Sequence, residues 1–252
     1  MLNHGGIKIS SINYTFDEEY EVLNRNFLNS LVDCKISIIG HKIKKIEGER
    51  DAYERAGWRP YSTHQFRDKI KQKLEKIIIS IRDNQKYAII WSDVDIVFLK
   101  PFIQIHKNLL KIMNNFELAI SPEWKNYLNS GFFVCFCNQN TLKFFSKVLE
   151  VVEKAQVLEQ PVMNAMLGKK FYDTNKFDGI KTYEKIKWTT LPETYWNLTC
   201  CDTKISRETL IIHSNWMGGF KNYSEEILTG TFAEKKKQML DFFQKQYNDS
   251  LI

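Results

Sequence analysis

Apolar and polar positions follow two different periods along the first half of the chain. Residues 7–15 alternate between apolar and polar and are rich in Ile, Ser and Tyr, which predicts a strand. Asp17 follows and is predicted to cap a helix that ends near Leu31. Residues 35–39 predict a second strand, and residues 65–81 carry the clearest helical stripe, with apolar residues three or four positions apart.

The second half continues this alternation with less regular spacing. Residues 87–91 are apolar enough for a central strand that is buried on both faces. Other segments predict strands over residues 116–120, 132–137, 187–191 and 210–213, and helices over residues 142–152, 161–167 and 232–247. Alternating strands and helices predict an α/β fold with a mostly parallel central sheet flanked by helices. Such sheets bind ligands at the carboxyl ends of their strands.

A length of 252 residues is enough for one large domain core. We expect a single domain over residues 1–230, followed by a C-terminal amphipathic helix over residues 231–252. Hydrophobic residues make up 43% of the chain and charged residues 26%, which excludes disordered and fibrous proteins. The formal net charge is only +6 and the basic residues are spread out, so we expect no nucleic-acid partner.

Cysteine spacing and the N-terminal residues indicate in which cellular compartment the protein is expected. Five cysteines without a C-x-x-C pair argue against a disulfide framework and a structural zinc site, so we expect reduced thiols. The first residues do not resemble a signal peptide, and there is no run of about 18 apolar residues, so we expect a cytoplasmic protein. Residues 235–237 are three lysines beside an apolar helix face, which could make peripheral contact with an anionic membrane or pack on the domain.

Two carboxylates directly follow the predicted central strand. The segment from Tyr87 to Phe102 reads YAIIWSDVDIVFLKPF and places Asp93 and Asp95 two residues apart. Residues with this spacing point the same way on an extended chain. Two close carboxylates repel each other unless a cation lies between them, and Mg²⁺ or Mn²⁺ prefers such oxygen ligands. The alternative is an acidic surface loop.

This segment resembles the D-x-D segment of GT-A-fold glycosyltransferases, especially the nucleotide-diphospho-sugar transferases and the retaining family 8 enzymes. The resemblance implies a GT-A (Rossmann-like) fold. It also implies that Asp93 and Asp95 bind Mn²⁺ (or Mg²⁺) and that the metal grips the diphosphate of a nucleotide-sugar donor. Three later segments appear in the family's order and extend the resemblance over roughly residues 7–221.

Two of these segments belong to the donor-sugar side in the family. Asn129, Ser130 and Gly131 resemble the N-[SA]-G segment, which lines the donor sugar. Glu159 and Gln160 resemble the D-Q pair beside the reacting sugar, which makes both residues candidates for a catalytic role. Glu159 stands where the family usually has Asp.

The third segment, from His213 to Lys221, resembles the family's late segment of His, Gly and Lys. There the His is the third metal ligand and the Lys meets the diphosphate, although the spacing here is longer. From the residues alone, His213 ends an apolar strand and could complete a Mn²⁺ site, or it could be a structural histidine. Gly219 belongs to a glycine pair that could let a diphosphate approach the backbone, or form a simple turn.

Four further residues are weaker candidates. Lys73 lies on the helix before the Asp93 strand, where the family often carries a basic residue, but taken alone it fits a solvated lysine. Tyr14 and Thr15 could bracket the nucleotide base by analogy with the fold, or they could be purely structural. Trp196 could stack on an acceptor sugar or fill the core.

The motifs together predict a metal-dependent glycosyltransferase. It would move a sugar from a nucleotide-diphosphate donor, with UDP favoured, to a glycan or lipid-linked glycan, as in polysaccharide biosynthesis. The family 8 resemblance implies retention, whereas an inverting enzyme would need a base such as Glu159 or Glu123. One alternative is a haloacid-dehalogenase-like phosphatase, because residues 93–97 match D-x-D-x-[TV]. Another is a non-catalytic nucleotide-sugar-binding module.

Overall fold

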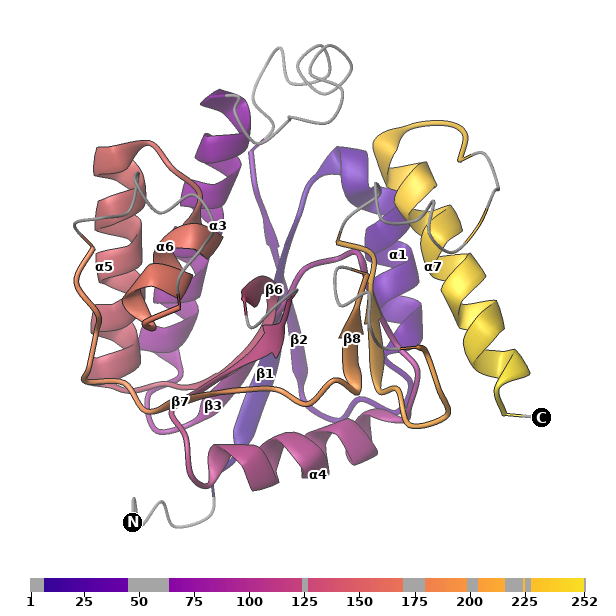
Figure 1. Ribbon diagram of the computed structural model, residues 1–252, viewed down its shortest axis with the longest axis horizontal. Helices are drawn as coiled ribbons and strands as arrows, with labels where there is room; N and C mark the ends of the chain where they lie inside the picture. Colours follow the sequence, from indigo (N-terminus) through magenta and orange to yellow (C-terminus); the bar gives the residue numbers. More distant parts are fainter. Residues whose placement is uncertain are drawn as a thin grey trace.

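A six-stranded sheet runs through the centre of the computed structural model, in the order β2-β1-β3-β6-β5-β7 (Figure 1). Only β6 is antiparallel to its neighbours, β3 and β5. The strands are β1 (Ile9–Phe16), β2 (Ser37–Lys42), β3 (Ala88–Ser92), β5 (Leu118–Pro122), β6 (Leu128–Phe136) and β7 (Trp188–Thr190). The structure describes residues 7–44, 64–123, 127–169, 180–198, 204–215, 224 and 228–251. The predicted α/β fold with a mostly parallel sheet is confirmed.

Each face of this sheet packs on its own set of helices. Ala88 and Ile90 of β3 belong to one apolar core. Ile89 and Trp91 point the opposite way and belong to the other. The first core is covered by α1 (Glu21–Ser30), α4 (Phe102–Met113) and α7 (Phe232–Asp249), and the second by α3 (His64–Asp83), α5 (Gln139–Ala155) and α6 (Glu159–Met166). Burial on both faces explains why β3 lacks an alternating pattern.

The next strand, β4 (Ile96–Phe98), leaves the central sheet and joins a three-stranded sheet in the order β4-β9-β8. It pairs antiparallel with β9 (Ile211–His213), so that Ile96 lies opposite His213. Strand β8 (Tyr195–Asn197) runs parallel to β9. The residues between β3 and β4 therefore lie where the two sheets meet, beside the end of β9.

Most predicted elements are present with ends shifted by a few residues. Asp17 caps the short 3₁₀ helix η1 (Glu18–Tyr20), which leads into α1, and its side chain accepts a hydrogen bond from the Tyr20 N–H (3.1 Å). Helix α6 begins at Glu159 and not at Pro161, because a proline in the first turn removes an N–H that has no intrahelical partner. Strands β4 and β8 and helix α4 were not predicted. Both strands have three residues and lie at the edges of the smaller sheet.

The C-terminal helix α7 packs on the domain. It begins with a capping box in which Thr231 and Glu234 each accept the other's backbone N–H. Met239, Leu240 and Phe243 on its apolar face are fully buried in the core that also holds α1 and β9. This face is therefore not free for a membrane surface, and the alternative of packing on the domain is correct. Among the described helices, none is long and apolar enough to cross a membrane. The boundary at residue 230 stays a prediction.

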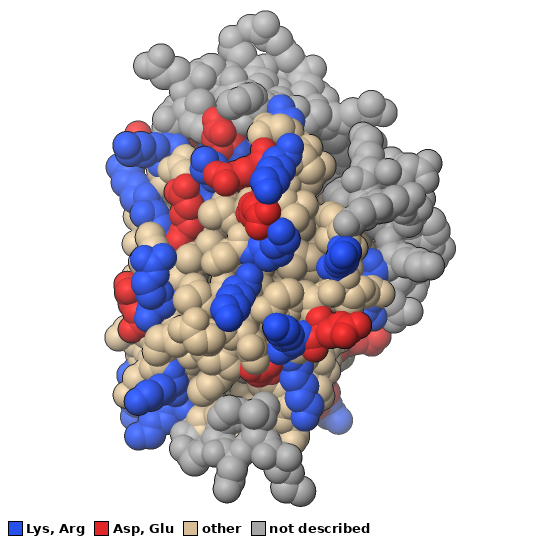
Figure 2. Space-filling view, turned by 90° about the vertical axis from the view of Figure 1, so that its left-hand side faces the viewer, with Lys and Arg blue, Asp and Glu red and all other residues tan. Residues whose placement is uncertain are grey.

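Charges of both signs are mixed on the surface that α5 and α3 share (Figure 2). Lys147 and Lys154 both pair with Glu150, at 2.8 and 2.7 Å. Lys71 of α3 pairs with Glu153 of α5 at 2.6 Å. On this face the basic residues are dispersed among acidic ones, as the sequence indicated.

The described cysteines are free thiols, as predicted. Cys135 and Cys137 are buried, and Cys34 is half-buried. Burial raises the pKa of the Cys135 thiol well above its ordinary value. Cys200 and Cys201 lie outside the described residues.

Candidate metal and donor site

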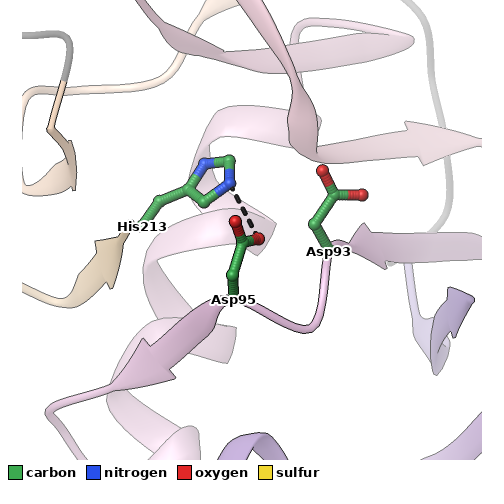
Figure 3. Close-up of side chains that lie close together, drawn as sticks. All are labelled: Asp93, Asp95 and His213. Carbon is green, nitrogen blue, oxygen red and sulfur yellow. Dashed lines mark ion pairs between the residues drawn. The ribbon is translucent and has the colours of Figure 1, made fainter. Parts of the chain in front are cut away.

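Asp93, Asp95 and His213 converge at the junction of the two sheets (Figure 3). The turn between β3 and β4 carries both carboxylates. Its backbone is fixed on one side by the Asp93 N–H, which donates to the Gly131 carbonyl of β6 (2.7 Å). On the other side the Asp95 carbonyl accepts the Ser214 N–H (3.0 Å). One possible ligand atom from each of the three side chains lies within 4.8 Å of the other two.

This set of atoms fits a divalent cation. Carboxylate oxygens suit Mg²⁺ or Mn²⁺, and an imidazole nitrogen favours the transition metal. The His213 Nε2 atom lies 3.1 Å from Oδ1 of Asp95, which turns it toward the carboxylates (Figure 3). Asp95 and His213 are buried, whereas the Asp93 side chain is 32% exposed. The exposed side of Asp93 leaves an approach for a ligand's phosphate oxygens.

Two buried lysines stand on either side of the three residues. Nζ of Lys73, from α3, lies 2.9 Å from Oδ1 of Asp93 and 3.3 Å from Oε1 of Glu159. Nζ of Lys236, from α7, donates to Oδ2 of Asp95. Each carboxylate of the D-x-D segment therefore has its own lysine.

The lysines set the protonation of the site. Burial alone would raise the pKa of Asp95, but Lys236 and His213 outweigh it and hold this pKa well below its usual range. Burial raises the pKa of Asp93; Lys73 opposes the shift and the Asp95 charge adds to it. Burial would lower the pKa of Lys73, yet Asp93 and Glu159 raise it above its ordinary value. Lys73 is therefore charged at neutral pH.

A chain of hydrogen bonds continues from Lys73 along β6 and α6. The Ser130 hydroxyl donates to Oε1 of Glu159 (2.9 Å), and the Ser130 N–H donates to Oε1 of Gln160 (3.0 Å). The Gln160 amide in turn donates to Oε2 of Glu123. Both residues lie in the first turn of α6, and their hydrogen bonds to Ser130 hold them at the start of β6.

The N-S-G segment, residues 129–131 of β6, packs against the candidate metal ligands. Oδ1 of Asn129 accepts the Gly131 N–H (2.8 Å) within β6, where the register against β5 shifts. A Cβ atom at Gly131 would overlap the imidazole of His213 and lie 2.7 Å from Oδ2 of Asp93. Only glycine allows β6 to pass this close to the three candidate ligands.

The other predicted residues are distributed as follows. The Tyr14 ring is buried in the core, 4.9 Å from the ring centre of Phe27, and its neighbour Thr15 is half-buried. Their contact with a nucleotide base stays a prediction. Gly219 and Lys221 lie outside the described residues.

For two side chains the structure decides between the interpretations that the sequence left open. Trp196 is buried against Phe243, with ring centres 4.9 Å apart, so it is a core residue and not a platform for an acceptor sugar. Lys73 is 6% exposed and ion-paired, so its interpretation as a solvated lysine is wrong.

Lys236 was not predicted as a site residue, because residues 235–237 resemble a single run of charged surface residues. The signal was present in the helical spacing. Lys236 is three and four residues before Met239 and Leu240, which places it on the buried stripe of α7. A lysine on an apolar stripe indicates a buried partner, and that partner is Asp95.

Comparison of the sequence with models of known protein families gives one match. A model of the nucleotide-diphospho-sugar transferase family matches residues 77–223, more than half of the chain. The matched range contains Asp93, Asp95 and His213, while Lys73 and Lys236 lie outside it. No curated protein sequence matches the chain.

Solved glycosyltransferases share the fold. The glycosyltransferase GlyE of Streptococcus pneumoniae TIGR4 matches 96% of this chain with a TM-score of 0.54 and 10% identity. The chain spans 64% of the length of GlyE. A glycosyltransferase involved in the glycosylation of the major capsid of PBCV-1 matches 92% of this chain and is covered over 100% of its own length, with a TM-score of 0.50 and 12% identity. At these identities the structures show a shared, GT-A-like α/β fold.

Proposed function

Because the chain belongs to the nucleotide-diphospho-sugar transferase family, we propose that Asp93, Asp95 and His213 hold a divalent cation that binds the diphosphate of a UDP-sugar donor. The observation that carries this proposal is the convergence of three ligand atoms within 4.8 Å at the carboxyl end of β3. Membership in the family supports a nucleotide-sugar glycosyltransferase over a phosphatase, although D-x-D-x-[TV] fits both.

The ligand set supports a choice between the two candidate ions. Two carboxylates with one imidazole nitrogen favour Mn²⁺, with Mg²⁺ as the second choice. When bound, the cation would stabilise the negative charge that develops on the departing nucleoside diphosphate. Lys221, if it reaches the diphosphate as the family pattern implies, adds a second positive charge.

The α6 residues are proposed to act on the sugar. Gln160 is held between Ser130 and Glu123, so its amide has a fixed orientation beside the proposed donor-sugar side of the site. A fixed polar group of this kind can orient the sugar for reaction without reorganising. Asn129 and Ser130 would line the same part of the site and contact the sugar hydroxyls.

We propose retention of configuration, and the hydrogen bonds of Glu159 argue against this residue as the base of an inverting enzyme. An inverting enzyme needs a carboxylate that is free to take a proton from the acceptor. Glu159 is 4% exposed and already accepts hydrogen bonds from Lys73 and Ser130. Front-face attack on the side of the leaving group requires no dedicated base, which agrees with this arrangement. We propose a hexose as the transferred sugar and a glycan or lipid-linked glycan as the acceptor, in a cytoplasmic pathway of polysaccharide synthesis.

Calorimetry with UDP and GDP tests the proposal, each with Mn²⁺ and with EDTA. We expect UDP to bind only with the metal, and the binding to disappear in Asp93→Asn. This variant is chosen because Lys73 keeps Glu159 as a partner when the Asp93 charge is removed. Asp33→Asn is the matched control, since Asp33 is exposed at a turn with φ 57°, which Asn also adopts.

Three outcomes can be told apart. Metal-dependent binding of either nucleotide identifies the donor base. Binding without hydrolysis or transfer of any nucleotide sugar would favour a non-catalytic binding module. The absence of binding by both nucleotides under every metal condition would refute the donor site.

A further inference from the structure

Lys236 is a charged residue in an apolar setting. It lies on the buried stripe of α7, and its side chain is 9% exposed. Its ammonium donates to Oδ2 of Asp95 and lies 5.2 Å from the ring centre of Phe232. The neighbouring Lys237 points away and pairs with Asp241 on the surface (2.6 Å).

Stability alone does not account for such a residue. Bringing a lysine and a carboxylate out of water has a large desolvation cost, and an apolar residue of similar size is often at least as stable in the same place. Met at this position would continue the stripe formed by Met239 and Leu240. The ammonium is therefore best explained by what it does at Asp95.

The charges of the site show what Lys236 changes. Among the ion-paired groups next to the candidate ligands, three carboxylates (Asp93, Asp95 and Glu159) face two lysines, Lys73 and Lys236, so the carboxylates outnumber the lysines by one. A divalent cation would reverse the sign and leave one net positive charge. Without Lys236 the cation would only neutralise the site. Lys236 therefore makes the metal-loaded site attractive to an anion.

The position of Lys236 points to the same ligand. The two lysines lie on different sides of the metal ligands, Lys73 toward Glu159 and α6, and Lys236 at Asp95. Lys73 is shared between Asp93 and Glu159 and so links the metal ligands to the proposed sugar side, whereas Lys236 pairs with Asp95. A cation on Asp95 would compete with the ammonium for the same carboxylate and free its N–H donors for the phosphate oxygens that the cation binds.

On the basis of the function proposed above, we infer that Lys236 binds the diphosphate of the donor. Helix α7 thereby contributes a substrate-binding residue to the site, from outside the range that the family model matches. The ammonium pairs with Asp95 in the empty site and with the diphosphate in the loaded one.

Two binding measurements test this inference. Mn²⁺ affinity is measured by electron paramagnetic resonance without nucleotide, and UDP (or GDP) affinity by calorimetry at saturating Mn²⁺. In Lys236→Met we expect Mn²⁺ affinity to be equal or higher, because a competitor for Asp95 is gone. We expect nucleotide affinity to fall about 10- to 100-fold, as for the loss of a hydrogen bond between charged groups. Lys236→Arg should retain most of the affinity, and Lys237→Met should match the wild type.

Equal nucleotide affinity in Lys236→Met and the wild type would overturn the inference and make Lys236 a structural partner of Asp95. If the wild type binds neither nucleotide, the proposed function fails first. If Lys236→Met does not fold, the ¹⁵Nζ resonance of Lys236 in the wild type gives the answer, identified by its loss in Lys236→Arg. A shift on adding UDP with Mg²⁺, beyond that with Mg²⁺ alone, supports diphosphate binding, and no further shift refutes it.

Discussion

Gly131 packs against His213, so close that a Cβ atom on Gly131 would overlap the imidazole ring. The same atom would lie 2.7 Å from Oδ2 of Asp93 and 2.8 Å from Oδ1 of Asn129. Real Cβ atoms essentially never approach other atoms this closely, so a side chain here must displace its neighbours. The neighbours are two candidate metal ligands and Asn129, which accepts the Gly131 N–H.

Gly131→Ala should therefore weaken metal binding. The added methyl would push His213 and Asp93 out of the geometry that brings their ligand atoms together, and we expect Mn²⁺ affinity to fall by a factor of about 10–100, the range for disturbed metal-site geometry. Gly40→Ala is the control. Its Cβ would also clash with a neighbour, the Tyr14 hydroxyl at 2.7 Å, but none of the candidate metal ligands is among its nearest neighbours. Electron paramagnetic resonance of Mn²⁺ distinguishes the two variants. Equal affinities would mean that the three residues do not bind the metal together.

Asp95→Asn should destabilise the metal-free protein, because it leaves Lys236 buried without a countercharge. Removing one partner of a buried ion pair costs about 3–5 kcal/mol. The double variant Asp95→Asn/Lys236→Met should recover most of this loss, since neither buried charge remains. Urea unfolding in EDTA measures the free energy of unfolding for the four proteins of the cycle. If the two single losses simply add in the double variant, the ion pair is not a coupled unit in solution.

Metal selectivity should depend on His213. Imidazole nitrogen is a better ligand for Mn²⁺ than for Mg²⁺, so His213→Asn should lower Mn²⁺ affinity more than Mg²⁺ affinity. In the wild type, Mn²⁺ at 100 times its dissociation constant should stabilise the fold by about 2.7 kcal/mol, and EDTA should remove the gain. Thermal unfolding with each ion gives both results. An unchanged preference in His213→Asn would exclude His213 as a ligand.

The sequence predicted those parts of the site that depend on local pattern. Asp93 and Asp95 stand out because they end an apolar strand, and the order of the N-S-G, Glu-Gln and His segments identified the family. Each of these signals lies within a few neighbouring residues. The match of the family model and the convergence of Asp93, Asp95 and His213 support this part of the prediction.

The sequence could not predict pairings between distant elements. Lys73 and Glu159 are 86 residues apart, and Lys236 and Asp95 are 141 apart. No local period connects such residues, because their contact depends on how α3, α6 and α7 dock on the sheet. Lys236 was nevertheless detectable as a polar residue on an apolar stripe, although its partner was not. Strands β4 and β8 were also not predicted, although β9, which pairs with both and is equally short, was.

Gln160→Ala should reduce turnover far more than donor binding. Its side chain links the Ser130 N–H to Glu123, and it lies on the sugar side of the site, away from Asp95 and Lys236. Losing a group that orients the reacting sugar should lower kcat on the order of a hundredfold, the cost of a misplacement of about 1 Å. UDP affinity should stay within about twofold, because the metal and the diphosphate contacts remain.

Gln139→Ala, at an exposed position on α5, is the control. The assay follows release of nucleoside diphosphate from the donor sugar together with calorimetry of UDP. A parallel loss of kcat and UDP affinity would place Gln160 at the nucleotide, and unchanged turnover would remove it from the catalytic site.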